Sequence, residues 1–393
     1  MGYPTPQHLL NTSWTVHRLS PLHHGKEYHD TILGNADALK TYAKRLQDLL
    51  TGDVLRGVQV GLSASSTPSD DALVKAGALT DCRWEAIPTW SHWNEERERG
   101  HFYSDDDDTT EQRQQPIALK DTLGILVTLE YENATYKAAL LAGPDGYSDD
   151  RDDDDRKDST YLPLLLTRLP NPLRQTFVSF LSVTFDTYCS ILRLPSSFLC
   201  ATLDSYIASL TAAGEDNQQS SGTSRLLLES VMKETQLTLA FAPSVAPALR
   251  TLDVHLPRET LATFAIDGSK ITSSGTTMDE VSSPFLTSLS HYFNKHLAMK
   301  IDLTQSWGRR KNPANEHIWL SKIASGAFVL GAEGRVKLVA DPERTGGSTG
   351  EDAINDHEDE ARTNRLILRA NENILRALVR RAVGEDLQVA HKT

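Results

Sequence analysis

The segment IWLSKIASGAFVLGAEGRVKLVA, residues Ile318 to Ala340, decides the fold of the chain. It is interpreted as two strands joined by a turn at Gly331–Gly334, because glycines interrupt two apolar runs. The first run would carry apolar side chains on both faces, since side chains alternate along a strand. Such a strand must be covered on both faces, within the chain or by a partner. It contains no reactive group, which favours assembly over catalysis.

The alternation divides the first run into two sets of apolar side chains. Ser325 and Gly326 between them leave room for another backbone or side chain to approach closely. Which set leaves the chain's own core stays open at this point. One set is Ile318, Leu320, Ala324, Phe328 and Leu330, and the other is Trp319, Ile323, Ala327 and Val329.

Strands and helices are expected in both halves of the chain, from the period of the apolar residues. Helices are expected after Asn35 as far as Gly52, from Asn171 with a buried face that extends to Tyr188 and Leu192, at Pro195–Leu210, at Leu286–Leu297 and at Glu360–Val383. Strands are expected at Trp14–Leu19, Val54–Leu62, Leu123–Leu129, Ala134–Ala142, Tyr161–Leu169, Leu237–Phe241, Leu249–Leu256 and Ala298–Leu303.

The length of 393 residues allows two or three domains. The polar segment GEDNQQSSGTS, residues 214–224, has the composition of a linker. We therefore expect an N-terminal α+β region over 1–213, with acidic loops near 95–115 and 144–159. A C-terminal α+β region over 225–393 would end in an amphipathic helix.

The net charge of −13 is concentrated in three acidic runs. Asp105–Asp108, Asp149–Asp158 and Glu351–Glu360 together carry −14, so the rest of the chain is close to neutral. Runs of this kind are usually solvated loops. Binding of basic segments such as histone tails is the alternative.

Basic groups gather in two places. Arg309, Arg310 and Lys311 form a loop that could be a nuclear address, a phosphate contact or simply a loop. On a helical wheel, five arginines of the last helix share one face, opposite Ile367, Ile374, Leu375 and Leu378. This stripe fits either a solvated face or a surface for phosphate or an acidic partner. It consists of Arg362, Arg365, Arg369, Arg376 and Arg380.

Catalytic and metal-binding patterns are weak. His23, His24 and His29 lie close together but match no zinc spacing. Ser230 and Lys233 match a short nucleophile motif without its companion elements. We expect no enzyme activity, cofactor, metal or small-molecule substrate. No run is long and apolar enough for a membrane span, and three cysteines without a CxxC pair fit the nucleus or cytosol.

Four segments in order resemble the fungal CENP-L family of inner-kinetochore proteins. They are NTSWTVHRLSPLHHGKE (Asn11–Glu27), GDVLRGVQVGL (Gly52–Leu62), YLPLLLTRLPNPLRQTFVSFLSVTFDTYCSILRL (Tyr161–Leu194) and SKIASGAFVLGAEGRVKLV (Ser321–Val339). The resemblance implies an α+β fold with curved, mainly antiparallel sheets and packed helices, in part like the TATA-binding-protein saddle. The mixture of predicted strands and helices agrees with it.

The resemblance also implies a function and partners. The protein would be a nuclear, non-enzymatic scaffold at the centromere, supporting kinetochore assembly and chromosome segregation. It would pair with a CENP-N-type subunit, contact other inner-kinetochore subunits, and reach the CENP-A nucleosome through that complex. Direct binding of duplex DNA by residues 309–311 and the arginine stripe is the alternative. The residues that the resemblance implies for binding the CENP-N-type partner are Ile318, Leu320, Ile323, Ala327, Phe328, Val329, Val336 and Leu338.

Overall fold

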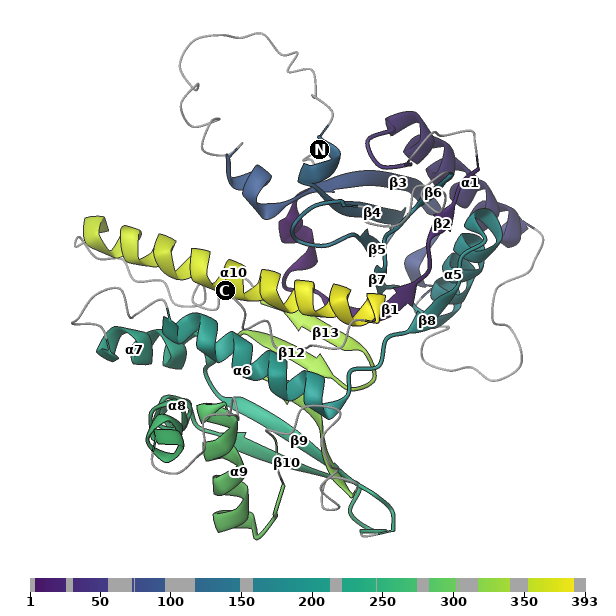
Figure 1. Ribbon diagram of the computed structural model, residues 1–393. Coiled ribbons are helices and arrows are strands. Elements are labelled where there is room, and N and C mark those ends of the chain that lie inside the picture. Colours follow the sequence, from purple (N-terminus) through teal and green to yellow (C-terminus); the bar gives the residue numbers. More distant parts are fainter. Residues whose placement is uncertain are drawn as a thin grey trace. The chain divides into compact units, whose positions relative to one another are not determined.

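The computed structural model describes two compact units of the chain (Figure 1). Unit 1 comprises 1–192 and 378–393, and unit 2 comprises 193–377. The residues described are 4–25, 31–55, 73, 75–95, 117–148, 158–212, 221–244, 246–273, 283–301, 303, 317–339 and 353–384, with backbone alone at 53–55, 221–224, 266–273 and 353–361.

Unit 1 is built on an antiparallel sheet with the strand order β3-β4-β5-β7-β1, and the short β8 also pairs with β1. The predicted hairpin is confirmed as β4 and β5, with Gly124 opposite Leu141. A second small sheet joins β2 (Leu22–His23) to β6 (Ser159–Thr160). The strands of the main sheet are β1 (Ser13–Leu19), β3 (Leu79–Pro88), β4 (Thr122–Tyr131), β5 (Thr135–Leu141), β7 (Leu164–Arg168) and β8 (Cys189–Ile191).

Helices α1 (Ala36–Leu55) and α5 (Asn171–Phe185) supply the core of unit 1 together with this sheet. The predicted caps are confirmed, because Asn35 Oδ1 accepts the Ala38 N–H at 3.0 Å and Pro172 lies in the first turn of α5. Aromatic rings of Tyr42, Trp84 and Phe185 pack within 4.6–6.3 Å of one another. Unit 1 also contains two short 3-10 helices, η1 (Pro6–Leu9) and η2 (Leu119–Asp121).

Unit 2 contains an antiparallel sheet with the order β10-β9-β11-β12-β13. Its helices gather on one face of this sheet (Figure 1), and α10 begins in unit 2 and ends in unit 1. The strands are β9 (Thr235–Phe241), β10 (Thr251–Leu256), β11 (Ile318–Ala324), β12 (Phe328–Gly331) and β13 (Arg335–Leu338). The helices are α6 (Ser196–Ala212), α7 (Ser221–Met232), α8 (Arg258–Ser273), α9 (Pro284–Leu297) and α10 (Ala353–Val383). The α+β class with mainly antiparallel sheets is thus confirmed.

Two predicted strands are wrong where the structure describes them. Val54 and Leu55 continue helix α1, because Gly52 is accommodated inside the helix rather than ending it; residues 56–62 lie outside the described part. Ala298 is no strand residue, because its left-handed backbone (φ 53°) ends α9 and its N–H bonds to the Phe293 carbonyl.

Helix α5 is shorter than its apolar spacing predicted. Asp186 takes a left-handed conformation (φ 47°) and ends the helix. Tyr188 therefore lies outside α5 and is 73% exposed. Leu192 is buried, but it follows strand β8 and is not part of the helix. Helix α8 was not predicted at all.

The division between the units falls at 192/193, before the polar segment 214–224. Helix α6 lies in unit 2, where the hydroxyl of Ser196, its first residue, accepts the backbone N–H of Leu320 at 3.1 Å. Residues 221–224 form the first turn of α7. The domain bounds 1–213 and 225–393 stay a prediction from composition.

The β4–β5 hairpin requires a glycine at position 124. A Cβ there would lie 2.0 Å from the Leu140 carbonyl oxygen, a backbone atom that cannot swing away. We expect Gly124→Ala to cost about 1–3 kcal/mol of unfolding free energy, measured by urea denaturation.

Gly52→Ala is the matched control for this substitution. A Cβ on Gly52 meets nothing within 4 Å inside α1, so alanine should stabilise the protein by about 0.5–1 kcal/mol. Equal stability of the Gly124→Ala variant and the wild type would contradict the close approach in the hairpin.

Candidate protein interface

The segment 318–340 folds differently from the two strands predicted. Three strands lie there, because the chain turns back at Ser325–Ala327 and β12 pairs with β11, with Ile323 opposite Leu330. The Ser325 hydroxyl accepts the Ala327 and Phe328 N–H groups at 3.3 and 3.2 Å. The single turn predicted for this segment, at Gly331–Gly334, is confirmed as the β12–β13 turn.

Gly326 occupies the tight place that its sequence context predicted. Its N–H donates to the Met232 carbonyl at 2.8 Å. A Cβ on Gly326 would come within 3.0 Å of the Val231 carbonyl oxygen and the Lys233 side chain. The turn is therefore held against the end of α7 by a close contact that a larger residue would disturb.

A β-bulge explains why β11 looked apolar on both faces. Leu320 pairs with Leu239 while Lys322 pairs with Thr238, so the register shifts at Ser321. The bulge places Leu320 and Ile323 on the same buried face, although alternation alone would separate them. The interpretation as one strand that needs cover on both faces is therefore wrong.

Most of the residues proposed for partner binding are buried in the core of unit 2. The Phe328 ring packs 4.9 Å from the Tyr206 ring of α6, between centroids. Ile318 and Val329 are partly exposed. The role of the set in binding a partner stays a prediction, and the buried members could act only through the shape of the sheet. The buried members are Leu320, Ile323, Ala327, Phe328, Val336 and Leu338.

The opposite face of the unit 2 sheet carries the accessible groups. Across the strands, Asp253 is opposite Thr238, Thr238 is opposite Lys322, and Gly331 is opposite both Lys322 and Arg335. A parallel row begins at His255 and ends at Lys337. We call this the open face, defined by Gln236, Thr238, Ala240, Thr251, Asp253, His255, Trp319, Lys322, Ala324, Val329, Gly331, Arg335 and Lys337.

The open face is electrically polarised. Its β10 side carries Asp253 and the His255–Glu234 pair, whose Nδ1 and Oε1 atoms lie 3.2 Å apart. Its β11–β13 side carries Lys322, Arg335 and Lys337. The Thr238 hydroxyl donates to the Asp253 carboxylate at 2.6 Å, and this bond lowers the pKa of Asp253, so the acidic end stays charged.

Trp319 is the large apolar side chain of the open face, at 36% exposure. The sequence placed Trp319 and Val329 on one side together with Ile323 and Ala327, but Trp319 and Val329 share the open face and the other two are buried. The basic residues Lys322, Arg335 and Lys337 were not predicted as part of a surface. Once the bulge and the turn are placed, strand alternation brings all of them to one face.

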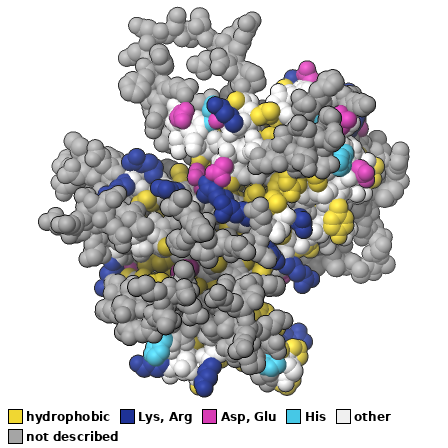
Figure 2. All heavy atoms as spheres, in the orientation of Figure 1, with side chains coloured by type: hydrophobic (Ala, Val, Ile, Leu, Met, Phe, Trp, Pro, Cys, Tyr) yellow, Lys and Arg dark blue, Asp and Glu magenta, His cyan; other side chains and the backbone are white. Residues whose placement is uncertain are grey.

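The predicted basic groups have different outcomes. Arg309, Arg310 and Lys311 lie outside the described residues. On α10 the apolar face is confirmed, with Ile367, Ile374, Leu375 and Leu378 at most 2% exposed. Figure 2 shows dark blue side chains along this helix. Arg362, Arg365, Arg369 and Arg380 are exposed, whereas Arg376 is half-buried and donates to Asn373 Oδ1 at 2.6 Å.

The candidate reactive groups have structural roles where they are described. Burial raises the pKa of the Cys82 and Cys200 thiols to about 12 and that of Cys189 to about 11. They are protonated at neutral pH and are therefore weak nucleophiles. Ser230 donates its hydroxyl proton to the Leu227 carbonyl of its own helix. No group of metal-ligating side chains occurs among the residues that the structure describes.

A comparison with protein families matches residues 8–383 to the model named "CENP-L: Centromere protein L". The chain belongs to the CENP-L family. The match covers nearly the whole chain, including all the strands and helices named above except the first two residues of η1. No curated protein sequence matched the chain.

Membership of the CENP-L family makes this protein a component of the centromere and kinetochore and connects it with chromosome segregation. It also implies a nuclear location at the centromere. The fungal branch of the family stays an expectation. Within the described residues, no helix has the length and apolar character needed to cross a bilayer.

Neighbouring residues on opposite faces of β12 test which face is accessible. Phe328→Asp places a carboxylate in the core and should cost about 3 kcal/mol or more. Val329→Asp lies on the open face and should change stability by within about 1 kcal/mol. Thermal and urea denaturation of both variants measures the difference. Equal destabilisation would show that the Val329 face is also enclosed.

Proposed function

We propose that this CENP-L protein is a non-enzymatic scaffold of the inner kinetochore. It pairs with a CENP-N-type subunit through its C-terminal region, joins further inner-kinetochore subunits, and reaches the CENP-A nucleosome through that complex. The observation that carries the proposal is the open face, a five-stranded sheet surface that bears Trp319 and Val329 and is opposite to the helix-covered face.

The open face has the composition of an interface. Ala240 and Ala324 are small, partly exposed residues of this face, beside which a partner surface can pack closely. Trp319 and Val329 supply apolar anchors, which carry much of the binding energy in protein interfaces. Asp253 lies on one outer strand, and Arg335 and Lys337 lie on the other, as in a polar rim, while Lys322 lies on the central strand.

The sheet also offers an edge. β10 is the terminal strand of unit 2 among those described, and it pairs with β9 alone. A strand of the partner could extend the sheet there through backbone hydrogen bonds. Sheet extension at β10 and packing on the open face are two modes of the same proposed assembly.

Substitutions on the open face should separate assembly from folding. We expect Trp319→Asp and Val329→Asp to lower capture of a co-expressed CENP-N-type subunit at least about tenfold, because each buries a carboxylate in the interface. Co-purification from an expressing cell, with the ratio of the two chains measured, gives the result.

Val183→Asp is the matched control, since Val183 is 83% exposed on α5 of unit 1. It adds the same charge to a surface outside the proposed interface and should leave capture unchanged. Full capture by the folded Trp319 and Val329 variants would contradict the assignment of the interface to the open face.

Direct binding of duplex DNA is the second candidate function. The exposed Arg362, Arg365, Arg369 and Arg380 on α10 favour it, because arginines spaced along a helix can follow phosphates. The isolated protein should then bind duplex DNA with an affinity that falls steeply with salt. Arg365→Glu with Arg369→Glu should reduce the salt slope by about two. No binding at low salt would exclude this function for the isolated chain.

A further inference from the structure

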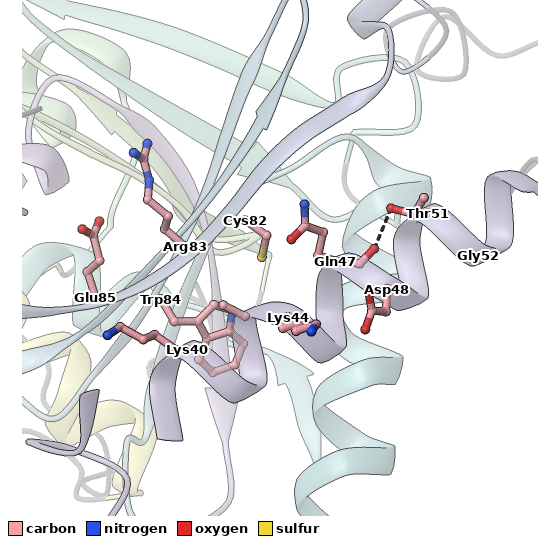
Figure 3. A pocket seen from close by; sticks show the side chains of 11 residues that line it. Lys40, Lys44, Gln47, Asp48, Thr51, Gly52, Cys82, Arg83, Trp84 and Glu85 are labelled. Atoms are coloured by element: carbon pink, nitrogen blue, oxygen red, sulfur yellow. Dashed lines mark hydrogen bonds between the residues drawn. The ribbon is translucent and has the colours of Figure 1, made fainter. Parts of the chain in front are cut away.

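A groove of about 830 Å³ lies in unit 1 between α1 and β3 (Figure 3). One wall is a helix surface and the other is a strand at the end of the described sheet. The described residues that line it are Lys40, Ala43, Lys44, Gln47, Asp48, Thr51 and Gly52 from α1, and Cys82, Arg83, Trp84 and Glu85 from β3.

The strand wall belongs to the edge of the unit 1 sheet. β3 pairs with β4 on one side and is the last strand in the order of the described sheet. Four consecutive residues, Cys82 to Glu85, line the groove, although their side chains alternate between the two faces of the sheet. Consecutive residues line one groove when it follows the backbone edge, so the edge of β3 faces the groove.

The helix wall carries a regular series of charges. Lys40, Lys44 and Asp48 are exposed and four residues apart on α1, so they lie on one side of the helix about 6 Å apart along its axis. Alternate side chains of an extended strand are about 6.6–6.8 Å apart. A strand lying along α1 would therefore present its alternate side chains to the three charges in turn.

The floor of the groove has one buried polar group without a suitable acceptor. Trp84 is 4% exposed, and its Nε1–H reaches no nitrogen or oxygen acceptor. The neighbouring Cys82 sulfur is only a weak acceptor for it. An unpaired donor at this depth favours an oxygen acceptor brought by a ligand.

The other charged groups limit what can enter. Arg83 is engaged by Asp81 and Glu130 on the sheet. The Glu85 carboxyl is partly buried and partly desolvated, and this raises its pKa. Asp48 and Glu85 would repel the uniform negative charge of a nucleic acid, which a mixed-sequence peptide avoids.

We propose that the groove binds an extended segment of a partner protein, which adds as a strand to the edge of β3. The segment has acidic side chains at two alternate positions, facing Lys40 and Lys44, and a basic side chain at the next, facing Asp48. A backbone carbonyl or carboxylate of the segment accepts the Trp84 Nε1–H. This surface is separate from the open face, so it would serve a second partner.

A labelled peptide tests the charge pattern on the full-length protein. The probe is Thr-Glu-Val-Glu-Val-Lys-Thr, measured by fluorescence anisotropy at low and at physiological salt. We expect it to bind wild type, and binding to fall about tenfold or more with Lys40→Glu combined with Lys44→Glu. The charge-swapped peptide Thr-Lys-Val-Lys-Val-Glu-Thr should bind that double variant better than it binds wild type.

Arg45→Glu is the matched control, because Arg45 is an exposed cation of the same helix outside the groove lining. It should leave affinity within about twofold. Trp84→Phe should weaken binding a few-fold by removing the donor while keeping an aromatic ring.

Hydrogen exchange distinguishes strand addition from a loose electrostatic contact. Bound peptide should protect those amides of Cys82–Glu85 that point away from β4, and Trp319→Asp should change neither this protection nor the affinity. The proposal is overturned if wild type does not bind the peptide at millimolar concentration. It is also overturned if a scrambled peptide binds equally, or if protection appears away from β3.

Discussion

The close approach of Gly326 to the end of α7 is the constraint on which the surface of unit 2 depends. The hydrogen bond from Gly326 to the Met232 carbonyl fixes the turn, and the turn fixes where β12 returns along β11. Because side chains alternate, a displacement by one residue would exchange the two faces of β12. Phe328 would then be exposed and Val329 enclosed. The position of one glycine therefore decides which residues of β12 are accessible.

The bulge at Ser321 has the complementary effect on β11. It allows Leu320 and Ile323 to enter the core together and leaves Trp319 and Lys322 outside. The Ser321 hydroxyl donates to the Thr238 carbonyl at 3.0 Å, which ties the bulge to β9. Turn and bulge together convert an apparently two-sided apolar segment into an ordinary sheet with one buried face.

Local chemistry explains which elements were predictable from sequence. Asn35 marks a helix start because its side-chain oxygen accepts an otherwise unpaired N–H of the first turn. Pro172 marks another because proline has no N–H that would need a partner there. The β4–β5 hairpin was predictable from apolar runs around a short polar turn. By contrast, the helix ends at Asp186 and Ala298 depend on left-handed residues that are not glycine, and the bulge depends on pairing with β9. The α1–β3 groove was not predicted, since it requires two elements that are distant in sequence.

The charge polarity of the open face has a consequence for the proposed assembly. Asp253 lies on β10, whereas Lys322 lies on β11 and Arg335 and Lys337 lie on β13; the open-face residues of β9 between β10 and β11 are uncharged. A partner surface of uniform charge would be attracted at one end of the open face and repelled at the other. A partner surface with the reverse polarity would be attracted at both ends in one orientation. In the opposite orientation it would be repelled at both ends, because like charges in contact are unfavourable. In the proposed assembly, Trp319 and Val329 would therefore supply affinity, while the charges would set the orientation of the partner.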